Sequence, residues 1–390
     1  MPTRSFPRML AALVTVLALT LLPMATAVAQ DATPEAADEG ITAAASGLSA
    51  PRAFTWGSDG VMYVAQSGPG TTADATGAAE AVVKIVDGCP VPFAGVLPST
   101  VDQFRQVLGP MDVQFADSQL YILQVATPTG AGTPTPELPN GIYTVGADGS
   151  VSLWLDLTSY AEDNPSTNTP DSGNELDQPY RFLYDGDGFW MIDSNRGLVF
   201  FIGMDKSITQ IADLSQGHPV LTAMARDGQG GIYVGNLTPA PYVDGAARVV
   251  RIDRDGNVEQ IWSNLTTVTG LALDSDGTLY ALEMATGNES PASMRPGTGR
   301  LLRQTGPDTY EVVAYGLEYP IDLEIGPDGA FYVSMPAFGA NTEAGLILRI
   351  PAVATNLTVD LAQFDGATCD GAQPYTAPAP VPPGSPTPAS

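Results

Sequence analysis

The sequence is poor in the side chains on which most catalytic centres depend. Its 390 residues include one histidine, His218, and two lysines, Lys84 and Lys206. Neither lysine follows a glycine, so a Walker A loop is excluded, and no G-x-S-x-G nucleophile elbow is present. A Ser-His-Asp arrangement would depend wholly on His218, which precedes Pro219 and fits a loop better than a general base.

Positive charge and soft metal ligands are also scarce. The formal net charge is −27, from 16 Lys and Arg residues against 43 Asp and Glu residues. A surface this acidic repels phosphate backbones, so we expect no nucleic-acid partner. One histidine and two cysteines cannot form the usual tetrahedral zinc site. A bound metal would instead be Ca²⁺ or Mg²⁺ held by oxygen ligands.

The amino-terminal residues predict export. Arg4 and Arg8 precede an apolar run, and a small-x-small cleavage site follows at Ala27 to Ala29. This order predicts a signal peptide over residues 1–29, with an uncleaved anchor as the alternative. We therefore expect a secreted or periplasmic protein with no membrane span after cleavage of the signal peptide.

The remainder of the chain divides by composition. Residues 30–40 predict a flexible leader, residues 41–376 a folded domain, and residues 377–390 a Pro- and Ala-rich disordered tail. Cys89 and Cys369 are the two cysteines, and an even number in an exported chain predicts one disulfide. Two unpaired thiols are the alternative.

One short pattern repeats six times along the folded part. In residues 271–283 two alternating apolar runs flank an Asp-Gly turn, which is a strong β-hairpin signal. Each copy carries an aromatic residue just after the turn, and these residues lie roughly 40 to 70 positions apart. They are Tyr63, Tyr121, Trp190, Tyr233, Tyr280 and Tyr332. The repeat predicts an all-β fold, a six-bladed β-propeller with four antiparallel strands per blade.

The order of strands within each repeat predicts how the ring closes. Residues 41–45 form a strand with no repeat before it, so we assign it as the outermost strand of the last blade. Such an overlap pairs the first and last blades and removes an open sheet edge. The long insertions, such as residues 67–79, 126–140 and 285–299, all fall on one rim of the predicted ring. Loops gathered on one face are typical of a binding surface.

Polar residues stand where inner strands begin and second strands end on that rim. These positions converge on the central channel, so they are candidates for a ligand site. The candidates are Arg52, Asp112, Arg181, Asp193, Asn236, Glu283 and Asp322. Four of them, Asp112, Asn236, Glu283 and Asp322, carry oxygen ligands suited to Ca²⁺ or Mg²⁺. The alternative is that they hydrate the channel mouth or pair with the two arginines.

Several stretches resemble the ScyD/ScyE family of exported bacterial propellers. The likeness lies in residues 51–65, in residues 233–252 with Gly245-Ala246-Ala247-Arg248, and in residues 271–283. The hairpins are also similar to those of NHL-repeat and SMP-30/gluconolactonase-like propellers. The resemblance implies a six-bladed propeller outside the cytoplasm, and it carries over no reaction. Similarity to SMP-30-like lactonases would imply one divalent metal held by Glu, Asn and Asp in the channel.

Two functions follow as hypotheses. The first is a binding or accessory propeller, a monomer whose loop face holds a small molecule, a glycan or a protein. The second is a divalent-metal-dependent lactonase, hydrolase or lyase that acts at the central channel. Whether the protein is an enzyme is left open at this point.

Overall fold

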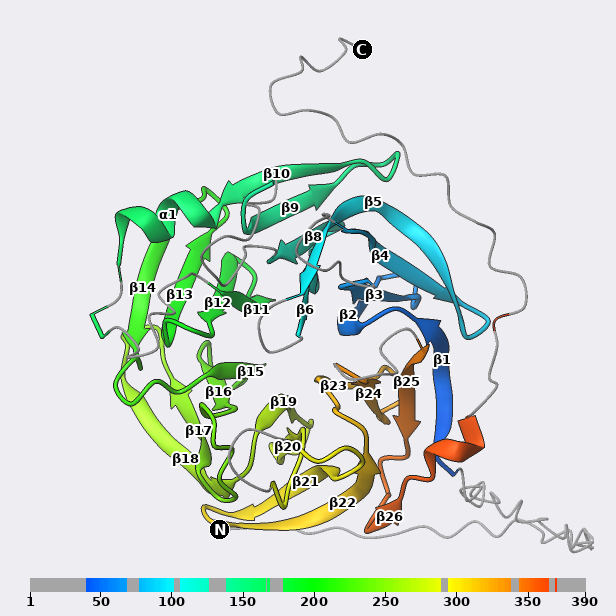
Figure 1. Cartoon of the computed structure of the whole chain (residues 1–390). Helices are drawn as coiled ribbons and strands as arrows, with labels where there is room; N and C mark the ends of the chain where they lie inside the picture. The colour runs from blue at the N-terminus through cyan, green and yellow to red at the C-terminus, as the bar shows by residue number, and fades with distance from the viewer. Residues whose placement is uncertain are drawn as a thin grey trace, which may run out of the picture. The chain divides into compact units, whose positions relative to one another are not determined.

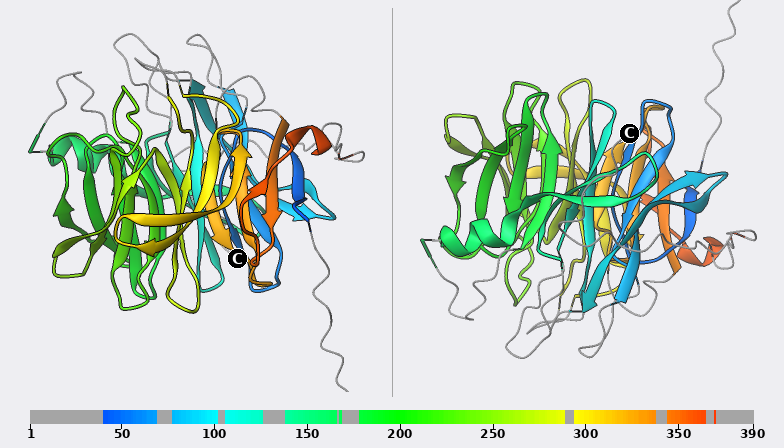
Figure 2. Two further views of the ribbon diagram at one scale, coloured as in Figure 1. Left: turned by 90° about the horizontal axis from the view of Figure 1, so that it is seen from below. Right: turned by 90° about the horizontal axis from the view of Figure 1, so that it is seen from above.

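The computed structural model describes residues 40–68, 77–101, 106–125, 138–165, 167–168, 178–288, 294–337, 344–364 and 369. The predicted signal peptide, the leader up to residue 39, the tail and most of the long insertions lie outside these residues. Within them the chain forms six small sheets arranged around a central channel as a six-bladed β-propeller, which confirms the predicted fold (Figure 1). The strands of each blade run between two rims (Figure 2).

The blades follow one another in chain order, each with its innermost strand first. Blade 1 contains β2 (Pro51–Trp56), β3 (Met62–Gln66), β4 (Gly77–Val86), β5 (Cys89–Val101) and β6 (Val107–Leu108), and blade 2 contains β7 (Pro110–Ala116), β8 (Gln119–Gln124), β9 (Gly141–Val145) and β10 (Val151–Asp156). Blade 3 contains β11 (Pro179–Tyr184), β12 (Gly188–Asp193), β13 (Leu198–Gly203) and β14 (Ile208–Asp213).

The second half of the ring repeats the arrangement. Blade 4 contains β15 (Leu221–Arg226), β16 (Ile232–Asn236), β17 (Ala247–Ile252) and β18 (Val258–Leu265), and blade 5 contains β19 (Val268–Leu273), β20 (Leu279–Glu283), β21 (Gly299–Gly306), β22 (Thr309–Leu317) and β26 (Leu357–Thr358). Blade 6 contains β23 (Asp322–Ile325), β24 (Phe331–Met335), β25 (Gly345–Ile350) and, outermost, β1 (Thr42–Leu48). Pairing is antiparallel except between β22 and β26.

The repeated pattern has a local physical cause. At the blade 5 turn, Asp274 Oδ1 accepts hydrogen bonds from the backbone N–H groups of Asp276 (2.9 Å) and Thr278 (2.8 Å). Gly277 takes a φ of +83°, which favours glycine. The Tyr280 hydroxyl then donates to Asp274 Oδ2 at 3.1 Å. The aspartate thus shapes the turn and fixes the aromatic residue that follows it, as also happens with Tyr63 and Asp59.

The amino-terminal strand closes the ring as the sequence predicts. β1 pairs with β25, with Thr42 opposite Arg349 and Leu48 opposite Gly345. The strand extends to Leu48, three residues beyond the predicted end at Ala45. Blade 6 therefore contains strands from both ends of the folded chain, and this overlap closes the ring.

The predicted disulfide is present beside this seam. Cys89 begins β5 and is bonded to Cys369, with a Cα–Cα distance of 5.4 Å. The turn before Cys89 also contacts β1, because the Ser46 N–H donates to Gly88 O at 3.1 Å. The disulfide thus ties the carboxy-terminal segment to blade 1 at the place where β1 passes it.

The connection after blade 2 contains an element that the strand pattern did not predict. Helix α1 (Leu157–Asp163) starts at Asp156, whose side chain accepts a hydrogen bond from the Ser159 N–H at 3.0 Å. This is an N-cap, and Leu157 is buried behind it. A 3₁₀ helix, η2 (Leu361–Phe364), follows the last blade. None of the helices in the described part of the chain is long and apolar enough to cross a membrane.

Candidate functional site

The inner strands β2, β7, β11, β15, β19 and β23 surround the central channel (Figure 1). The polar residues at their starts are all buried: the predicted candidates Arg52, Asp112, Arg181 and Asp322, and also Thr222 and Thr269. Buried polar groups require partners, so the partners of these side chains show what the site does.

Three of these residues form an ion cluster in the channel. Arg181 lies in blade 3, and its Nη2 contacts Oδ1 of Asp322 in blade 6, on the opposite side of the ring (Figure 1). Arg181 Nε also lies 3.5 Å from Oδ2 of Asp112 in blade 2. The guanidinium group therefore spans the channel and joins three blades. The sequence analysis had proposed these three residues as candidates for a ligand site, and here Arg181 lies between the two carboxylates.

The same carboxylates join neighbouring blades through the backbone. Asp112 Oδ2 accepts a hydrogen bond from the Phe182 N–H of blade 3 at 3.0 Å. Asp322 Oδ2 accepts one from the Phe54 N–H of blade 1 at 3.1 Å. Each carboxylate therefore uses one oxygen for the next blade's inner strand and holds Arg181 as well.

In the other half of the ring two threonines link neighbouring blades by hydrogen bonds, as Asp112 and Asp322 do. Thr222 Oγ1 of blade 4 donates to Val268 O of blade 5 at 2.5 Å. Thr269 Oγ1 of blade 5 donates to Pro320 O, directly before blade 6, at 2.9 Å. The strand-start positions are thus mainly links between blades.

Burial changes the acidity of the cluster. It raises the pKa of Asp112 from its ordinary value of 3.8 to about 7, against the opposing effect of Arg181 and with a further rise from Asp322. The pKa of Glu324, two residues after Asp322 in β23, is raised chiefly by burial and then by Asp322. A carboxyl group here gains a proton more readily than one at the surface.

The predicted residues at the ends of second strands have separate partners. Asp193 Oδ1 accepts from the backbone N–H of Gln178 (3.2 Å) and Arg196 (3.0 Å). Asn236 Oδ1 accepts from the backbone N–H of Arg248 at 3.0 Å. Each side chain therefore fixes the loops next to its own strand.

Glu283 is likewise engaged. Its Oε1 accepts from the Thr266 N–H at 2.6 Å and its Oε2 from Arg300 Nε at 2.5 Å. Burial raises the pKa of Glu283, and Arg300 opposes that rise. Glu283 is fully buried, and both partners of its carboxylate lie in blade 5 or in the turn that leads into it.

The predicted cation ligands are therefore not assembled as one set. Asp112 and Asp322 hold Arg181, while Asn236 and Glu283 contact backbone and Arg300 elsewhere. Among the described residues, no group of three or more His, Cys, Asp or Glu side chains is placed to hold a metal ion. These residues do not fit the Ca²⁺ or Mg²⁺ site expected from the sequence, because arginine already neutralises the carboxylates.

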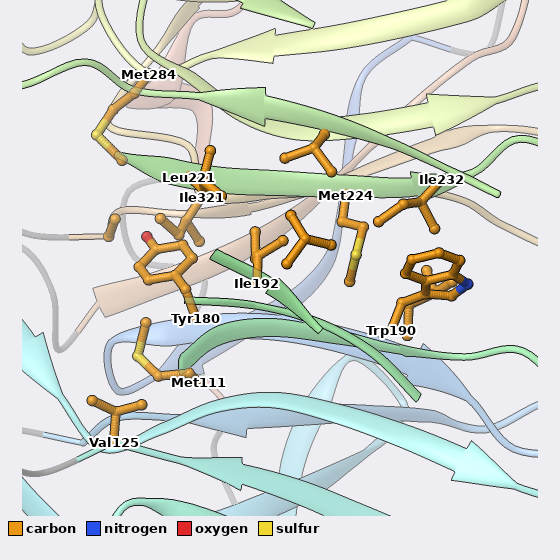
Figure 3. Packing of buried hydrophobic residues seen from close by; sticks show 14 of the residues in the cluster. Met111, Val125, Tyr180, Trp190, Ile192, Leu221, Met224, Ile232, Met284 and Ile321 are labelled. Carbon is orange, nitrogen blue, oxygen red and sulfur yellow. The ribbon is translucent and has the colours of Figure 1, made fainter. Parts of the chain in front are cut away.

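A cavity of about 170 Å³ lies at the loop-bearing end of the channel. Most of its walls are apolar, from Val220, Leu237, Ala240, Met284, Met294, Ile321 and Ala337. Figure 3 shows Tyr180, Leu221, Ile321 and Met284 gathered at one end of the adjoining buried cluster. Tyr180 and Ile321 directly precede Arg181 and Asp322, so the ion cluster lies one residue further along the inner strands.

The polar lining of this cavity includes Arg52, Tyr180 and Ser194. Arg52 is the predicted candidate that reaches the cavity, and its Nε donates to Ser67 Oγ at 3.0 Å while its Nη2 donates to Val107 O. Ser194 Oγ is buried and has no hydrogen-bond partner among the described residues.

Tyr180 is 4 % exposed, and its hydroxyl forms no hydrogen bond to another residue of the described chain. Burial raises the pKa of this hydroxyl, with Arg52 and Arg181 opposing the rise, so it stays protonated near neutral pH and can donate a hydrogen bond.

Sequence reasoning missed Tyr180, Ser194 and Met284. Their positions in the sequence could have indicated them, because each is adjacent to a predicted site residue. Tyr180 precedes Arg181, Ser194 follows Asp193, and Met284 follows Glu283. Apart from Arg52, the predicted polar residues are engaged in structural contacts, whereas Tyr180, Ser194 and Met284 beside them face the cavity.

Comparisons with known proteins agree with the fold. No protein-family model matches the chain, and no curated protein matches it in sequence. An oxidoreductase from Thermus thermophilus, described as a glucose dehydrogenase, is similar in structure, with 15% identity, a TM-score of 0.50, and coverage of 79% of this chain and 98% of that one.

Two further solved structures share the architecture at lower scores. A gluconolactonase from Xanthomonas campestris has 12% identity and a TM-score of 0.45, covering 80% of this chain and 89% of that one. Virginiamycin B lyase from Staphylococcus aureus has 12% identity and a TM-score of 0.42, covering 77% and 94%. At these identities the likeness concerns the propeller fold, and the ScyD/ScyE resemblance stays a prediction from sequence.

Proposed function

We propose that this protein is an exported small-molecule-binding propeller whose ligand occupies the cavity at the loop-bearing end of the channel. The observation that carries the proposal is the combination of apolar walls with two hydroxyl groups: that of Ser194, which is buried without a hydrogen-bond partner among the described residues, and that of Tyr180, which lines the cavity and forms no hydrogen bond within the described chain. A concave, mostly apolar site with a few convergent polar groups is the usual form of a ligand pocket.

Unpartnered buried hydroxyls support a ligand more than a purely structural role. Leaving a buried polar group without a partner costs about 1–3 kcal/mol relative to a satisfied one. A purely structural residue at position 194 would be more stable as an apolar side chain. A ligand atom that bonds to Ser194 would remove this cost on binding, and Tyr180 offers a second hydroxyl in the same cavity.

The alternative of a divalent-metal-dependent lactonase or lyase lacks its donor set. Such an enzyme uses the metal to polarise the substrate or to activate water, and it needs oxygen ligands around one open position. Here Arg181 and Arg300 occupy the carboxylates that the sequence suggested for this purpose. The volume of the cavity, about 170 Å³, suits a small molecule, which we propose as the partner of a monomeric chain.

Export is part of the proposal. The disulfide between Cys89 and Cys369 is compatible with an oxidising compartment, where such bonds persist. Together with the predicted signal peptide it supports a protein that meets its ligand outside the cytoplasm.

The test is a fragment screen by ligand-observed NMR on three proteins. Leu237→Trp enlarges a half-buried side chain in the cavity wall, and Val243→Trp makes a comparable change at an exposed position outside the lining. We expect fragments that bind the wild type to lose at least about tenfold in affinity, or about 1.4 kcal/mol, in Leu237→Trp and to bind Val243→Trp normally. If the fragments bind Leu237→Trp with the same affinity as the wild type, the cavity is not their binding site.

A further inference from the structure

The charge of the cavity is opposite to that of the chain. The sequence carries a formal net charge of −27. Among the fourteen described residues that line the cavity there is no aspartate or glutamate, and the charged side chain is Arg52. A small cationic ligand would therefore meet no carboxylate among the described lining residues, although the chain as a whole is rich in aspartate and glutamate.

The polar residues that line the cavity are Arg52, Gln106, Gln178, Tyr180, Ser194, Thr222 and Tyr242. All of these side chains can donate hydrogen bonds except where the proton is already used, and the two glutamines can also accept. Arg52 has donors only, and Tyr180 and Ser194 can each donate a hydroxyl proton. Thr222 already uses its hydroxyl proton on Val268 O, so its oxygen is left as an acceptor. The donor side of the cavity comes from β2 and from one end of the antiparallel β11–β12 pair, where Tyr180 lies near the start of β11 and Ser194 directly follows β12.

We infer that the ligand is a compact organic anion, with carboxylate-type oxygens held on the side of Arg52, Tyr180 and Ser194 and an apolar body against Met284, Met294 and Leu237. The inference rests on the proposed function, and it adds the chemical class of the ligand. Hydrogen bonds in which one partner is ionised are shorter and stronger than neutral ones, so buried donors favour an anion over a neutral molecule.

The size of the cavity limits the apolar part. A volume of about 170 Å³ is close to that of engineered apolar cavities, of about 150 Å³, that bind benzene. The ligand body is therefore about one six-membered ring or a short branched chain. Met284 and Met294 supply flexible, polarisable walls that adapt to such a body.

Electrostatics should make the preference measurable. Two charges attract or repel more strongly in a protein interior than in water, and the sign reverses when the ligand charge is reversed. Arg181 lies next to Tyr180 but is paired with Asp112 and Asp322, so the charged side chain of the described lining that a ligand would meet is Arg52.

The closing experiment uses three probes of one shape: benzoate, benzamide and benzylammonium at neutral pH. Dissociation constants are measured by NMR titration for the wild type, Tyr180→Phe and Ser194→Ala, with Tyr160→Phe on α1 as the matched control. We expect benzoate to bind the wild type at least about tenfold more tightly than benzylammonium. We expect Tyr180→Phe to weaken benzoate about three- to tenfold, and Tyr160→Phe to leave it unchanged.

The outcomes separate this inference from the proposed function. If benzylammonium or benzamide binds as tightly as benzoate and Leu237→Trp still blocks them, the ligand class is wrong and the binding function stands. If benzoate binds equally well to the wild type and to Leu237→Trp, the anion does not occupy this cavity and both are wrong. Near-ultraviolet circular dichroism of each variant confirms that the fold is retained in the comparison.

Discussion

Tyr180 and Arg181 are neighbours in β11, yet they belong to two different kinds of polar site. Arg181 has two carboxylates as partners and spans the channel between three blades. Tyr180 faces the cavity and has no hydrogen-bond partner in the described chain. Arg181 has its polar partners within the fold, whereas the hydroxyl of Tyr180 is left to bind a ligand. Polarity at the channel alone therefore does not identify a binding site; the state of each group's partners does.

The largest expected effect comes from breaking the ion cluster. Arg181→Leu leaves Asp112 and Asp322 buried and facing each other, and removing one member of a buried pair costs about 3–5 kcal/mol. Urea unfolding followed by fluorescence should show this loss in the free energy of unfolding. Tyr180→Phe, one residue away, should change it by less than about 1 kcal/mol, because no hydrogen bond within the described chain is lost.

A rescue variant sharpens this first contrast. Adding Asp112→Asn and Asp322→Asn to Arg181→Leu removes the uncompensated charges, so part of the lost stability should return. If the triple variant is no more stable than Arg181→Leu, charge burial is not the reason for the loss. If Tyr180→Phe is as damaging as Arg181→Leu, the distinction between the two sites fails.

The second prediction concerns pH. The pKa of Asp112 is raised in the folded state to about 7 from 3.8, so the folded protein binds a proton there that the unfolded chain has released. This contribution to stability is complete below about pH 4 and is lost as the pH rises through about 7. Between about pH 5 and pH 8, the wild type should lose on the order of 1–4 kcal/mol from this group.

Asp112→Asn is the control variant for this pH dependence. Its amide keeps an oxygen that accepts from the Phe182 N–H, and it does not titrate. Its urea midpoint should fall less than that of the wild type between pH 5 and pH 8. Glu324 also has a raised pKa in the same cluster and will leave a residual slope. A wild type and variant with identical pH profiles would show that Asp112 keeps its ordinary acidity.

The sequence predicted the fold well because its signals are local. Each Asp-Gly turn shapes its own hairpin, as Asp274 does for Tyr280, and six copies of that unit define the blades. The closing strand was also predictable, because a strand that precedes the first repeat can pair only with the last blade when the ring closes. The disulfide was predicted from the even number of cysteines, and it joins Cys89 of blade 1 to Cys369, which follows the last strand and η2.

The directions of the side chains at the channel were harder to predict. The register shifts by one residue near the start of most inner strands, for example between Pro110 and Asp112 and between Pro179 and Arg181. Such a bulge re-aims the side chains beside it, and a one-residue shift moves a side chain to the other face. The prediction that Glu283 and Asn236 join Asp112 and Asp322 therefore failed, although each residue is buried near its expected strand end.

The smallest expected effect is that of divalent cations. A cation at about 100 times its dissociation constant would stabilise the folded state by about 2.7 kcal/mol if the predicted ligand set bound it. Because Arg181 and Arg300 already occupy the carboxylates, we expect Ca²⁺, Mg²⁺ and chelator to shift the melting temperature by less than about 1 °C at constant ionic strength. Asn236→Ala and the exposed Asp163→Asn separate a channel site from weak attraction to the acidic surface. If cations raise the melting temperature of the wild type and of Asp163→Asn but not of Asn236→Ala, the metal site exists and the arginine contacts give way to a cation. If cations raise the melting temperature of all variants equally, they bind the acidic surface. The contrast between the ion cluster and the cavity then holds.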